Sequence, residues 1–290
     1  MQPTVKRTAA IHDLSGFGRS SLTVIIPTLS VMGIQVCPVP TAVLSTHSGG
    51  FTDYLFHDLT DIMRDYTAHW KKTGLSFDCI YSGFLGSPRQ AAIVSDIIDD
   101  FKTKDSLTVV DPVMGDNGSL YNSVSKDMIP EMRKLIAKAD IIVPNCTEAA
   151  LLLGKEQADF LDKAEIKQWL QELSDMGPET VVITSVPDGK NAGQINTVAY
   201  EKKSGSFWKV SAQRLPGMYP GTGDTFASVM IGSLLHGESL PVSIDKAVQF
   251  ISQCIQTSRG YTYPRKYGTL LEQKLHLLLE PWLIAGFEDL

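Results

Sequence analysis

The segment Gly221-Thr222-Gly223-Asp224 places an acid at the start of an apolar helical run that begins at Thr225. Glycines allow a tight turn and close approach to a ligand. The start of a helix offers unpaired backbone N–H groups and a positive dipole end to an anion. A carboxylate there repels an anion, but it can take a proton from a hydroxyl while the N–H groups stabilise a phosphoryl group in transfer. The alternative is an aspartate that only stabilises the helix.

Four further oxygen-bearing side chains follow two successive strand-like runs: Asp111, Asp116, Asn145 and Glu148. Hard oxygen ligands suit Mg²⁺, which keeps several waters and bridges to phosphates. Taken singly, Asp111 can be a turn residue and Glu148 an acid that complements a helix dipole. Taken together, the four favour metal–phosphate chemistry.

Short β-branched runs alternate with helical patterns, which predicts an α/β fold with a mostly parallel sheet between two layers of helices. The predicted strands are Thr8–Leu14, Ile34–Val39, Phe77–Ser82, Leu107–Asp111, Ile141–Pro144 and Thr180–Ser185. The predicted helices between them are Leu22–Met32, Tyr54–Thr73, Arg89–Lys102, Lys126–Lys138 and Lys163–Met176. Gly, Ser, Thr, Asn and Asp gather after each strand, where open α/β sheets bind ligands.

The segment Ile195–Val210 breaks this alternation and predicts an antiparallel hairpin at an edge of the sheet. The helix at Thr225 follows it, and then helices near Val242–Ser258 and Leu270–Leu279. Because the sequence holds no linker, repeat or low-complexity tract, we expect one domain over residues 1–290.

Composition narrows the class of partner. Apolar residues make up 43% of the chain and charged residues 20%, with a net charge of −6, which is ordinary for a soluble globular protein. The absence of a Lys/Arg-rich run argues against nucleic acid or an anionic membrane as partner. The four widely spaced cysteines, with Cys79 and Cys254 in apolar surroundings, predict free thiols in a reducing cytoplasm. No apolar stretch approaches the roughly 18 residues of a membrane helix.

Two common nucleotide motifs fit poorly. Gly16-Phe17-Gly18 follows a strand, but it lacks the third glycine of a dinucleotide fingerprint, and no acid ends the second strand. The sequence has no G-x-x-x-x-G-K-[ST] motif. A nucleotide site in this chain is therefore neither a dinucleotide fold nor a P-loop.

The chain resembles the ribokinase superfamily and, within it, the kinases of pyridoxal, pyridoxamine and pyridoxine. The resemblance rests on Gly221-Thr222-Gly223-Asp224 before a helix, Asp111-Pro112-Val113-Met114-Gly115, and Pro144-Asn145-x-x-Glu148, in this order. It implies phosphorylation of the 5′-hydroxymethyl group of vitamin B6 by Mg²⁺-ATP, in a dimeric enzyme. Several members of the family also need a monovalent cation such as K⁺.

The resemblance also implies roles for individual residues. Asp224 would activate the hydroxyl, and the N–H groups of Gly221, Thr222 and Gly223 would form the anion hole. Ser15 would bind the pyridine ring, and the loop with His47 and Ser48 would cover the substrate. The expected nucleotide-side residues are Asp111, Asp116, Asn145, Glu148, Thr184, Ser185 and Gly223, with Asp111 and Glu148 serving the metal.

Two departures leave the substrate open. The second-strand loop reads Ser45-Thr46-His47-Ser48, where pyridoxal kinases typically carry Ser-Asn-His-Thr. The opening Asp13-Leu14-Ser15-Gly16-Phe17-Gly18 is also similar to hydroxymethylpyrimidine kinases, whose typical Gln-Asn pair this loop lacks. The alternatives to a B6 kinase are therefore a hydroxymethylpyrimidine kinase and a non-catalytic protein that binds the B6 vitamer.

Overall fold

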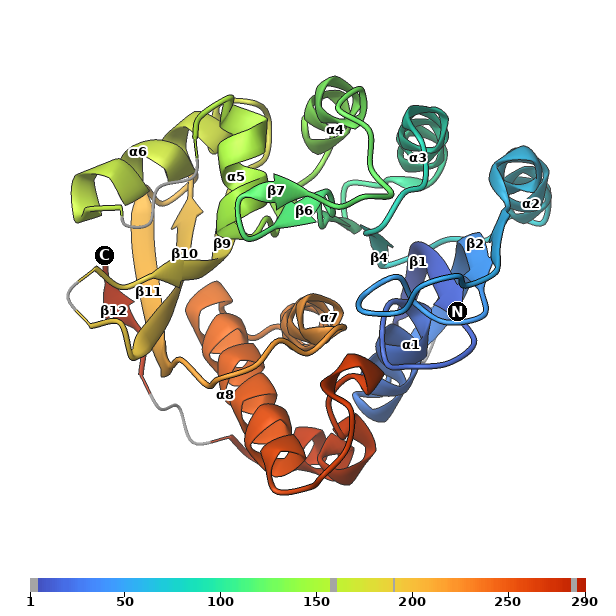
Figure 1. The fold of residues 1–290 in the computed structure, drawn as a ribbon. Helices are drawn as coiled ribbons and strands as arrows, with labels where there is room; N and C mark the ends of the chain where they lie inside the picture. Colours follow the sequence, from blue (N-terminus) through green and yellow to red (C-terminus); the bar gives the residue numbers. More distant parts are fainter. Residues whose placement is uncertain (1–4, 157–160, 190, 283–285) are drawn as a thin grey trace. The chain divides into compact units, whose positions relative to one another are not determined.

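The computed structural model describes residues 5–156, 161–189, 191–282 and 286–290 (Figure 1). The chain divides into two compact units. The first unit comprises Met1–Cys79 and Leu215–Ala285, and the second comprises Ile80–Arg214 and Gly286–Leu290. The expectation of one domain over residues 1–290 stays a prediction.

Three strands of the first unit lie side by side in the order β1, β2, β3. They are β1 (Arg7–Ser15), β2 (Gln35–Leu44) and β3 (Phe56–Asp58). β1 and β2 run parallel, and β3 pairs antiparallel with the end of β2. β1 is almost wholly buried, because its apolar residues are covered on both faces.

The helices of the first unit pack around these strands and on one another. They are α1 (Leu22–Val31), α2 (Thr60–Lys72), α7 (Thr222–Leu235) and α8 (Leu240–Arg259). Both α1 and α2 contact β2, and Figure 1 shows them on opposite sides of it. α7 packs between α1 and α8, and nine successive residues of α7, from Thr225 to Ser233, are buried. A helix that is apolar all round is a core helix, so the start of α7 is firmly placed.

The second unit carries the remaining strands in the order β4, β5, β8, β9, β10, β11, β12. Their bounds are β4 (Cys79–Ser82), β5 (Leu107–Val110), β8 (Ile141–Ile142), β9 (Thr180–Pro187), β10 (Gln194–Glu201), β11 (Ser206–Gln213) and β12 (Glu288–Asp289). β5, β8 and β9 run parallel, whereas β9 to β12 pair antiparallel. A two-stranded hairpin, β6 (Gly115–Asp116) and β7 (Ser119–Leu120), stands apart from this sheet.

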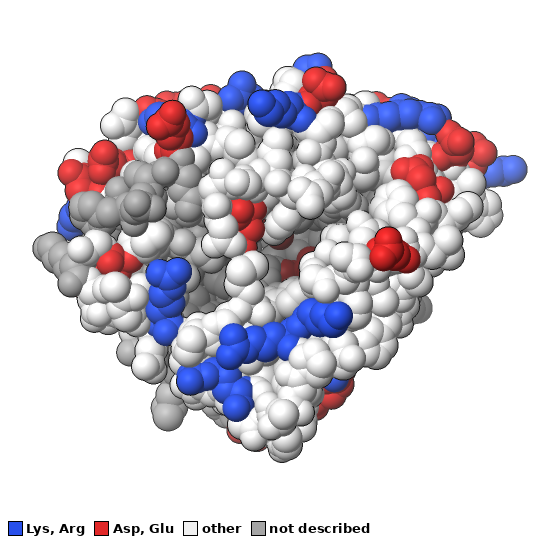
Figure 2. All heavy atoms as spheres, viewed as in Figure 1, with Lys and Arg blue, Asp and Glu red and all other residues white. Residues whose placement is uncertain are grey.

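Four helices belong to the second unit: α3 (Pro88–Phe101), α4 (Met128–Ile136), α5 (Cys146–Leu153) and α6 (Lys163–Ser174). α5 and α6 contact β9, and α6 also contacts β10. Basic and acidic side chains lie side by side over α4 in Figure 2. Within α4, Lys134 pairs with Glu131 at 2.7 Å. Exposed pairs of this kind add little stability.

The predicted α/β class, with parallel strands and an antiparallel hairpin towards the sheet margin, is confirmed. All four cysteines are free, and Cys79 and Cys254 are buried as expected. Within the described residues, no helix is both long and apolar enough to cross a membrane.

Two predicted helices are wrong in part. The helix expected over Tyr54–Thr73 begins only at Thr60, because residues 56–58 pair with β2 as β3. Asp58 fixes the change of direction, since its Oδ1 accepts a hydrogen bond from the Thr60 N–H at 2.7 Å. The pattern of apolar residues in the sequence did not predict β3, because all three of its residues are exposed.

The C-terminal helix expected over Leu270–Leu279 is instead two short 3₁₀ turns, Leu271–Gln273 and Leu275–Leu279, after an earlier turn at Arg265–Tyr267. Tertiary bonds hold this segment: the Leu270 N–H donates to the Ser258 hydroxyl at 2.8 Å, and Arg19 Nε lies 2.8 Å from Glu272 Oε1. Such contacts override a helical pattern.

Candidate functional site

The candidate site of the first unit is built on the start of α7. Gly221 is the N-cap residue, in a left-handed conformation with φ 78° and ψ 3°. A Cβ atom there would lie 2.2 Å from the carbonyl oxygen of Arg19, so glycine alone fits. Because the first N–H groups of a helix have no acceptor within it, Thr222 and Gly223 offer theirs at this point. The predicted anion-binding turn is therefore present as a local structure.

Asp224 lies in the first turn of α7 with its side chain 12% exposed. Its Oδ2 accepts a hydrogen bond from the Ser21 N–H at 2.7 Å, and its Oδ1 lies 4.0 Å from Nδ1 of His12. Burial raises the pKa of Asp224 to about 6, against hydrogen bonds from Ser21 and Ser20 and helped by the charge of Asp13. A carboxyl with a pKa near neutrality suits a general base.

His12 is fully buried on β1, and burial lowers its pKa to about 3. It is therefore neutral at pH 7, and its approach to Asp224 is not an ion pair at that pH. The charge of Asp224 has no cationic partner in His12.

Ser15, the residue expected to bind the substrate ring, is fully buried at the end of β1. Its hydroxyl donates to Oδ2 of Asp13 at 3.1 Å. Because its only proton is committed to Asp13, Ser15 can only accept a hydrogen bond from a ligand. The ring contact stays a prediction.

His47 also uses its ring within the protein. Its Nδ1 accepts the Gly49 N–H at 3.0 Å, so Nε2 carries the proton and donates to the Lys266 carbonyl oxygen at 2.7 Å. Burial lowers the pKa of His47, against the raising effects of the Lys266 bond and the Asp13 charge. His47 therefore ties the loop after β2 to the turn at Lys266, and neither ring nitrogen is left over for a substrate.

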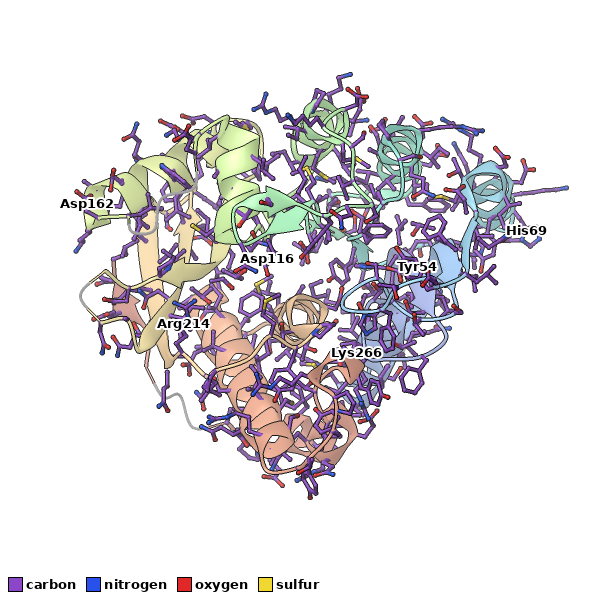
Figure 3. The ribbon with its side chains drawn as sticks, in the orientation of Figure 1. Tyr54, His69, Asp116, Asp162, Arg214 and Lys266 are labelled. Atoms are coloured by element: carbon purple, nitrogen blue, oxygen red, sulfur yellow. The ribbon has the colours of Figure 1, made fainter. Side chains whose placement is uncertain are left out.

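An aromatic cluster of Phe17, Phe51 and Tyr267 lies beside His47, whose ring meets Phe51 edge-on at 5.0 Å. The rings of Phe51 and Tyr267 are parallel with centroids 6.0 Å apart, and Phe17 meets Tyr267 edge-on at 4.9 Å. Lys266, labelled in Figure 3, holds its Nζ 4.5 Å from the centroid of the Phe51 ring. Ser48 is exposed beside this cluster, so its hydroxyl is open to solvent.

The candidate site of the second unit is built on the ends of β5 and β8 and on the start of α5. Asn145 and Glu148 form a reciprocal capping box: the Glu148 N–H donates to Asn145 Oδ1, and the Asn145 N–H donates to Glu148 Oε2, both at 2.9 Å. Glu148 Oε1 accepts the Met114 N–H at 3.0 Å. Burial raises the pKa of Glu148 to about 8, with the nearby Asp116 charge adding to the rise.

Four more of the predicted nucleotide-side residues lie in the second unit, whereas Gly223 lies at the start of α7 in the first unit. Asp111 is buried directly after β5, and its N–H donates to the Ser82 carbonyl oxygen at 2.9 Å. Asp116 lies on the β6–β7 hairpin, where Figure 3 labels it. Thr184 and Asn145 form an isolated parallel β-bridge. The next residue, Ser185, has a positive φ of 59°. The structure thus brings these predicted side chains to one region of the second unit.

Sequence reasoning missed Asp13 and Ser21, which contact Asp224 or its neighbours. Asp13 is the one charged residue of the apolar strand β1 besides its terminal Arg7, and that contrast was a usable signal. Ser21 offered no signal, because its importance comes from a backbone conformation that a sequence pattern does not reveal.

The buried charge of Asp224 gives a stability prediction. Because burial raises its pKa from 3.8 to about 6, the folded protein holds more protons than the unfolded chain between these pH values. Its stability therefore falls as the pH rises through this window, by about 3 kcal/mol in total. Asp224→Asn cannot ionise, so we expect it to unfold at higher urea concentration than wild type at pH 8. This difference in the urea concentration of unfolding should disappear towards pH 4. An equal difference at both pH values would contradict the raised pKa of Asp224.

Comparisons with known proteins show which family the chain is similar to. The family model for phosphomethylpyrimidine kinase matches residues 25–269. A crystal structure of a candidate phosphomethylpyrimidine kinase from Bacteroides thetaiotaomicron, obtained with pyridoxal, has 51% sequence identity and a TM-score of 0.96, and covers 99% of this chain and 100% of that chain.

Two further relatives are pyridoxal kinases. The crystal structure of the Lactobacillus plantarum enzyme has 33% identity and a TM-score of 0.86, over 95% of this chain and 97% of that one. The Sus scrofa enzyme is 29% identical over 243 residues, which cover 76% of this chain and 72% of the relative. The predicted family resemblance is confirmed.

Proposed function

The chain belongs to the phosphomethylpyrimidine kinase family and, with its pyridoxal kinase relatives, to the ribokinase superfamily, and we propose that it phosphorylates vitamin B6. The proposed reaction transfers the γ-phosphoryl group of ATP to the 5′-hydroxymethyl group of pyridoxal, pyridoxamine or pyridoxine. The product from pyridoxal is pyridoxal 5′-phosphate.

One observation carries the proposed chemistry: Asp224 sits in the first turn of α7, 12% exposed, with one carboxylate oxygen held by the Ser21 N–H. In the proposed step, Asp224 takes the proton of the acceptor hydroxyl as the hydroxyl oxygen attacks the γ-phosphorus of ATP. The bond between the γ-phosphorus and the β-phosphate oxygen breaks, and ADP leaves. The N–H groups of Gly221, Thr222 and Gly223 stabilise the negative charge on the transferred group. A protein that only binds the vitamer gains nothing from a buried carboxylate beside a phosphate, so the site favours catalysis.

The choice of vitamin B6 rests on the relatives and on the loop after β2. The Bacteroides relative was crystallised with pyridoxal. The loop keeps His47 and the Ser48 hydroxyl and lacks a Gln-Asn pair. Ser15, His47 and Ser48 are the proposed substrate-side residues, with His47 acting through the position of its loop. The description of the matching family keeps hydroxymethylpyrimidine as the second candidate acceptor.

We propose that the second unit binds ATP and its metal. Asp111 and Glu148 are the metal-side residues, and Asp116, Asn145, Thr184 and Ser185 line the nucleotide. No group of three His, Cys, Asp or Glu side chains within the described residues is arranged to hold a metal ion by itself. This fits Mg²⁺, which binds through one or two carboxylates together with substrate phosphates and water. Bound with ATP, Mg²⁺ supplies neutralisation of phosphate charge.

The metal assignment predicts the effect of Asp111→Asn. Loss of one carboxylate charge should raise the Mg²⁺ concentration for half-maximal activity about tenfold or more. Mg²⁺ titrations at saturating ATP measure it. Asp127→Asn, an exposed acid of the same unit with no side-chain cap bond, is the matched control and should titrate as wild type. Equal Mg²⁺ curves for all three proteins would remove Asp111 from the metal site.

The proposal is tested by ADP release with Mg²⁺-ATP and each acceptor in turn: pyridoxal, pyridoxamine, pyridoxine and hydroxymethylpyrimidine. We expect turnover with the B6 vitamers and a phosphorylated product of matching mass. Turnover with the pyrimidine alone would support the second candidate. Tight binding of pyridoxal without ADP release would support a non-catalytic B6 binder.

Three further properties belong to this proposal. The enzyme is a homodimer, which sedimentation at micromolar concentration tests. It is stimulated by K⁺, which replacement of K⁺ by Na⁺ in the assay tests. It works in the cytoplasm, in keeping with its four free cysteines, and cell fractionation tests this.

A further inference from the structure

A second buried carboxylate, Asp13, lies close to the proposed base. Asp13 is 5% exposed on β1, and it accepts hydrogen bonds from two hydroxyls: Ser21 Oγ at 2.5 Å and Ser15 Oγ at 3.1 Å. The pairing of β1 with β2 shifts register between His12 and Leu14, so that the irregularity falls on Asp13. Irregular pairing next to an active site re-aims a side chain. Burial raises the pKa of Asp13, and its charge raises the pKa of Asp224.

Ser21 joins the two carboxylates. Its hydroxyl donates to Asp13, and its backbone N–H donates to Asp224 Oδ2 at 2.7 Å. Ser21 is 4% exposed, and its bond to Asp13 is buried, whereas its bond to Asp224 is partly buried. It is the N-cap residue of α1, but its side chain makes no capping bond to that helix. A serine at this position usually caps the helix. Here its hydroxyl donates a hydrogen bond to Asp13 instead.

The backbone of Ser21 is strained. Its φ of 52° and ψ of −130° lie where glycine is favoured, as at the first central position of a type II′ turn. A non-glycine residue persists in such a conformation only when its surroundings hold it there. The bond to Asp13 is one such restraint on the side chain, and the bond to Asp224 is one on the backbone.

We infer that Asp13 is a positioning residue for Asp224: it tethers Ser21 in the conformation that directs the Ser21 N–H at Asp224 Oδ2. With Oδ2 fixed, Oδ1 is the oxygen presented to the acceptor hydroxyl. The inference rests on the proposed role of Asp224 as the base. The titratable groups facing Asp224 are Asp13 and the neutral His12 on β1, and its bonds come from Ser20 and Ser21 before α1.

Two substitutions of Asp13 separate the tether from the charge. Asp13→Ala removes both, so kcat should fall about 10- to 100-fold, as for a misplaced catalytic group, with KM within threefold of wild type. Asp13→Asn keeps an acceptor for the Ser21 hydroxyl but loses the charge. Its kcat should fall less, and the acid limb of its kcat profile should move to lower pH, because the repulsion that raises the pKa of Asp224 is gone.

Rescue gives the sharpest readout. Glycine adopts φ 52° without a tether, so Ser21→Gly combined with Asp13→Ala should restore kcat at least about fivefold over Asp13→Ala alone. A purely structural role for Asp13 does not predict this recovery. Asp58→Ala, which removes an exposed acid at the start of α2 in the same unit, is the matched control and should keep wild-type kcat and pH profile.

The outcomes separate this inference from the proposed function. If Asp13→Ala and Asp13→Asn both keep kcat and the acid limb of wild type, or if glycine at position 21 gives no recovery, the inference is overturned. If Asp13→Ala does not fold, Ser21→Ala decides, because it removes the hydroxyl that Asp13 holds and keeps the charge of Asp13: a wild-type kcat overturns the inference. If Asp224→Asn itself retains turnover, the role of Asp224 fails, whatever Asp13 does.

Discussion

Asp224→Asn is expected to lower kcat by about 10²–10⁴, the usual contribution of a general base. Asparagine keeps the size of the side chain and can still accept the Ser21 N–H with its amide oxygen. It cannot take a proton from the acceptor hydroxyl. Affinity for Mg²⁺-ATP should stay nearly unchanged, because the substitution removes an interaction of the transition state and not of the bound nucleotide. Steady-state kinetics and ATP-binding calorimetry measure the two effects.

Asp245→Asn is the matched control for this experiment. Asp245 is also a buried acid of the first unit, 2% exposed on α8, where its Oδ2 accepts from Gln249 at 2.6 Å. Its loss should cost stability and leave kcat of the folded enzyme within threefold of wild type. If Asp224→Asn also stays within threefold, Asp224 is not the base.

Gly221→Ala is expected to lower kcat by at least about 10²-fold, the cost of losing one donor that stabilises a developing charge. The added Cβ would lie 2.2 Å from the carbonyl oxygen and 3.0 Å from the carbonyl carbon of Arg19. These are backbone atoms, so the turn must move. The positive φ adds about 1–2 kcal/mol of strain for alanine. Both effects displace the N–H groups of Thr222 and Gly223.

Gly237→Ala is the matched control at the other end of α7. Gly237 also has a positive φ, of 87°, but a Cβ atom there meets nothing within 4 Å. The backbone strain in Gly237→Ala should therefore lower the unfolding temperature, while its kcat stays close to wild type. Equal losses of kcat in the two variants would mean that general destabilisation, and not the local turn, explains Gly221.

The features of the structure that the sequence predicted are local ones. The Gly221–Asp224 turn was predictable because two glycines, an acid and an apolar helix adjoin in the chain. The hairpin of β10 and β11 was predictable for the same reason, since its alternating runs flank a short polar turn. The capping box of Asn145 and Glu148 was not predicted, although their spacing of three residues is a signal from which it could have been.

The parts that the sequence did not predict depend on contacts between distant segments. Ser21 reaches Asp224 across 203 positions of the chain, and its backbone has a positive φ. His47 stays a predicted substrate-side residue, but the sequence did not predict that its Nε2 lies 2.7 Å from the Lys266 carbonyl oxygen, 219 positions away. Residues 56–58 form a strand only because β2 offers a free edge there.

The most direct test of the proposed function is an internal competition. Equal concentrations of pyridoxal and hydroxymethylpyrimidine are mixed with limiting Mg²⁺-ATP, and the two phosphorylated products are counted by mass spectrometry. The product ratio at low conversion equals the ratio of the two kcat/KM values, so it does not depend on the concentration of active enzyme. We expect pyridoxal 5′-phosphate in large excess, and its loss when the enzyme carries Asp224→Asn. Excess pyrimidine phosphate, or no phosphorylated product at all, would contradict it.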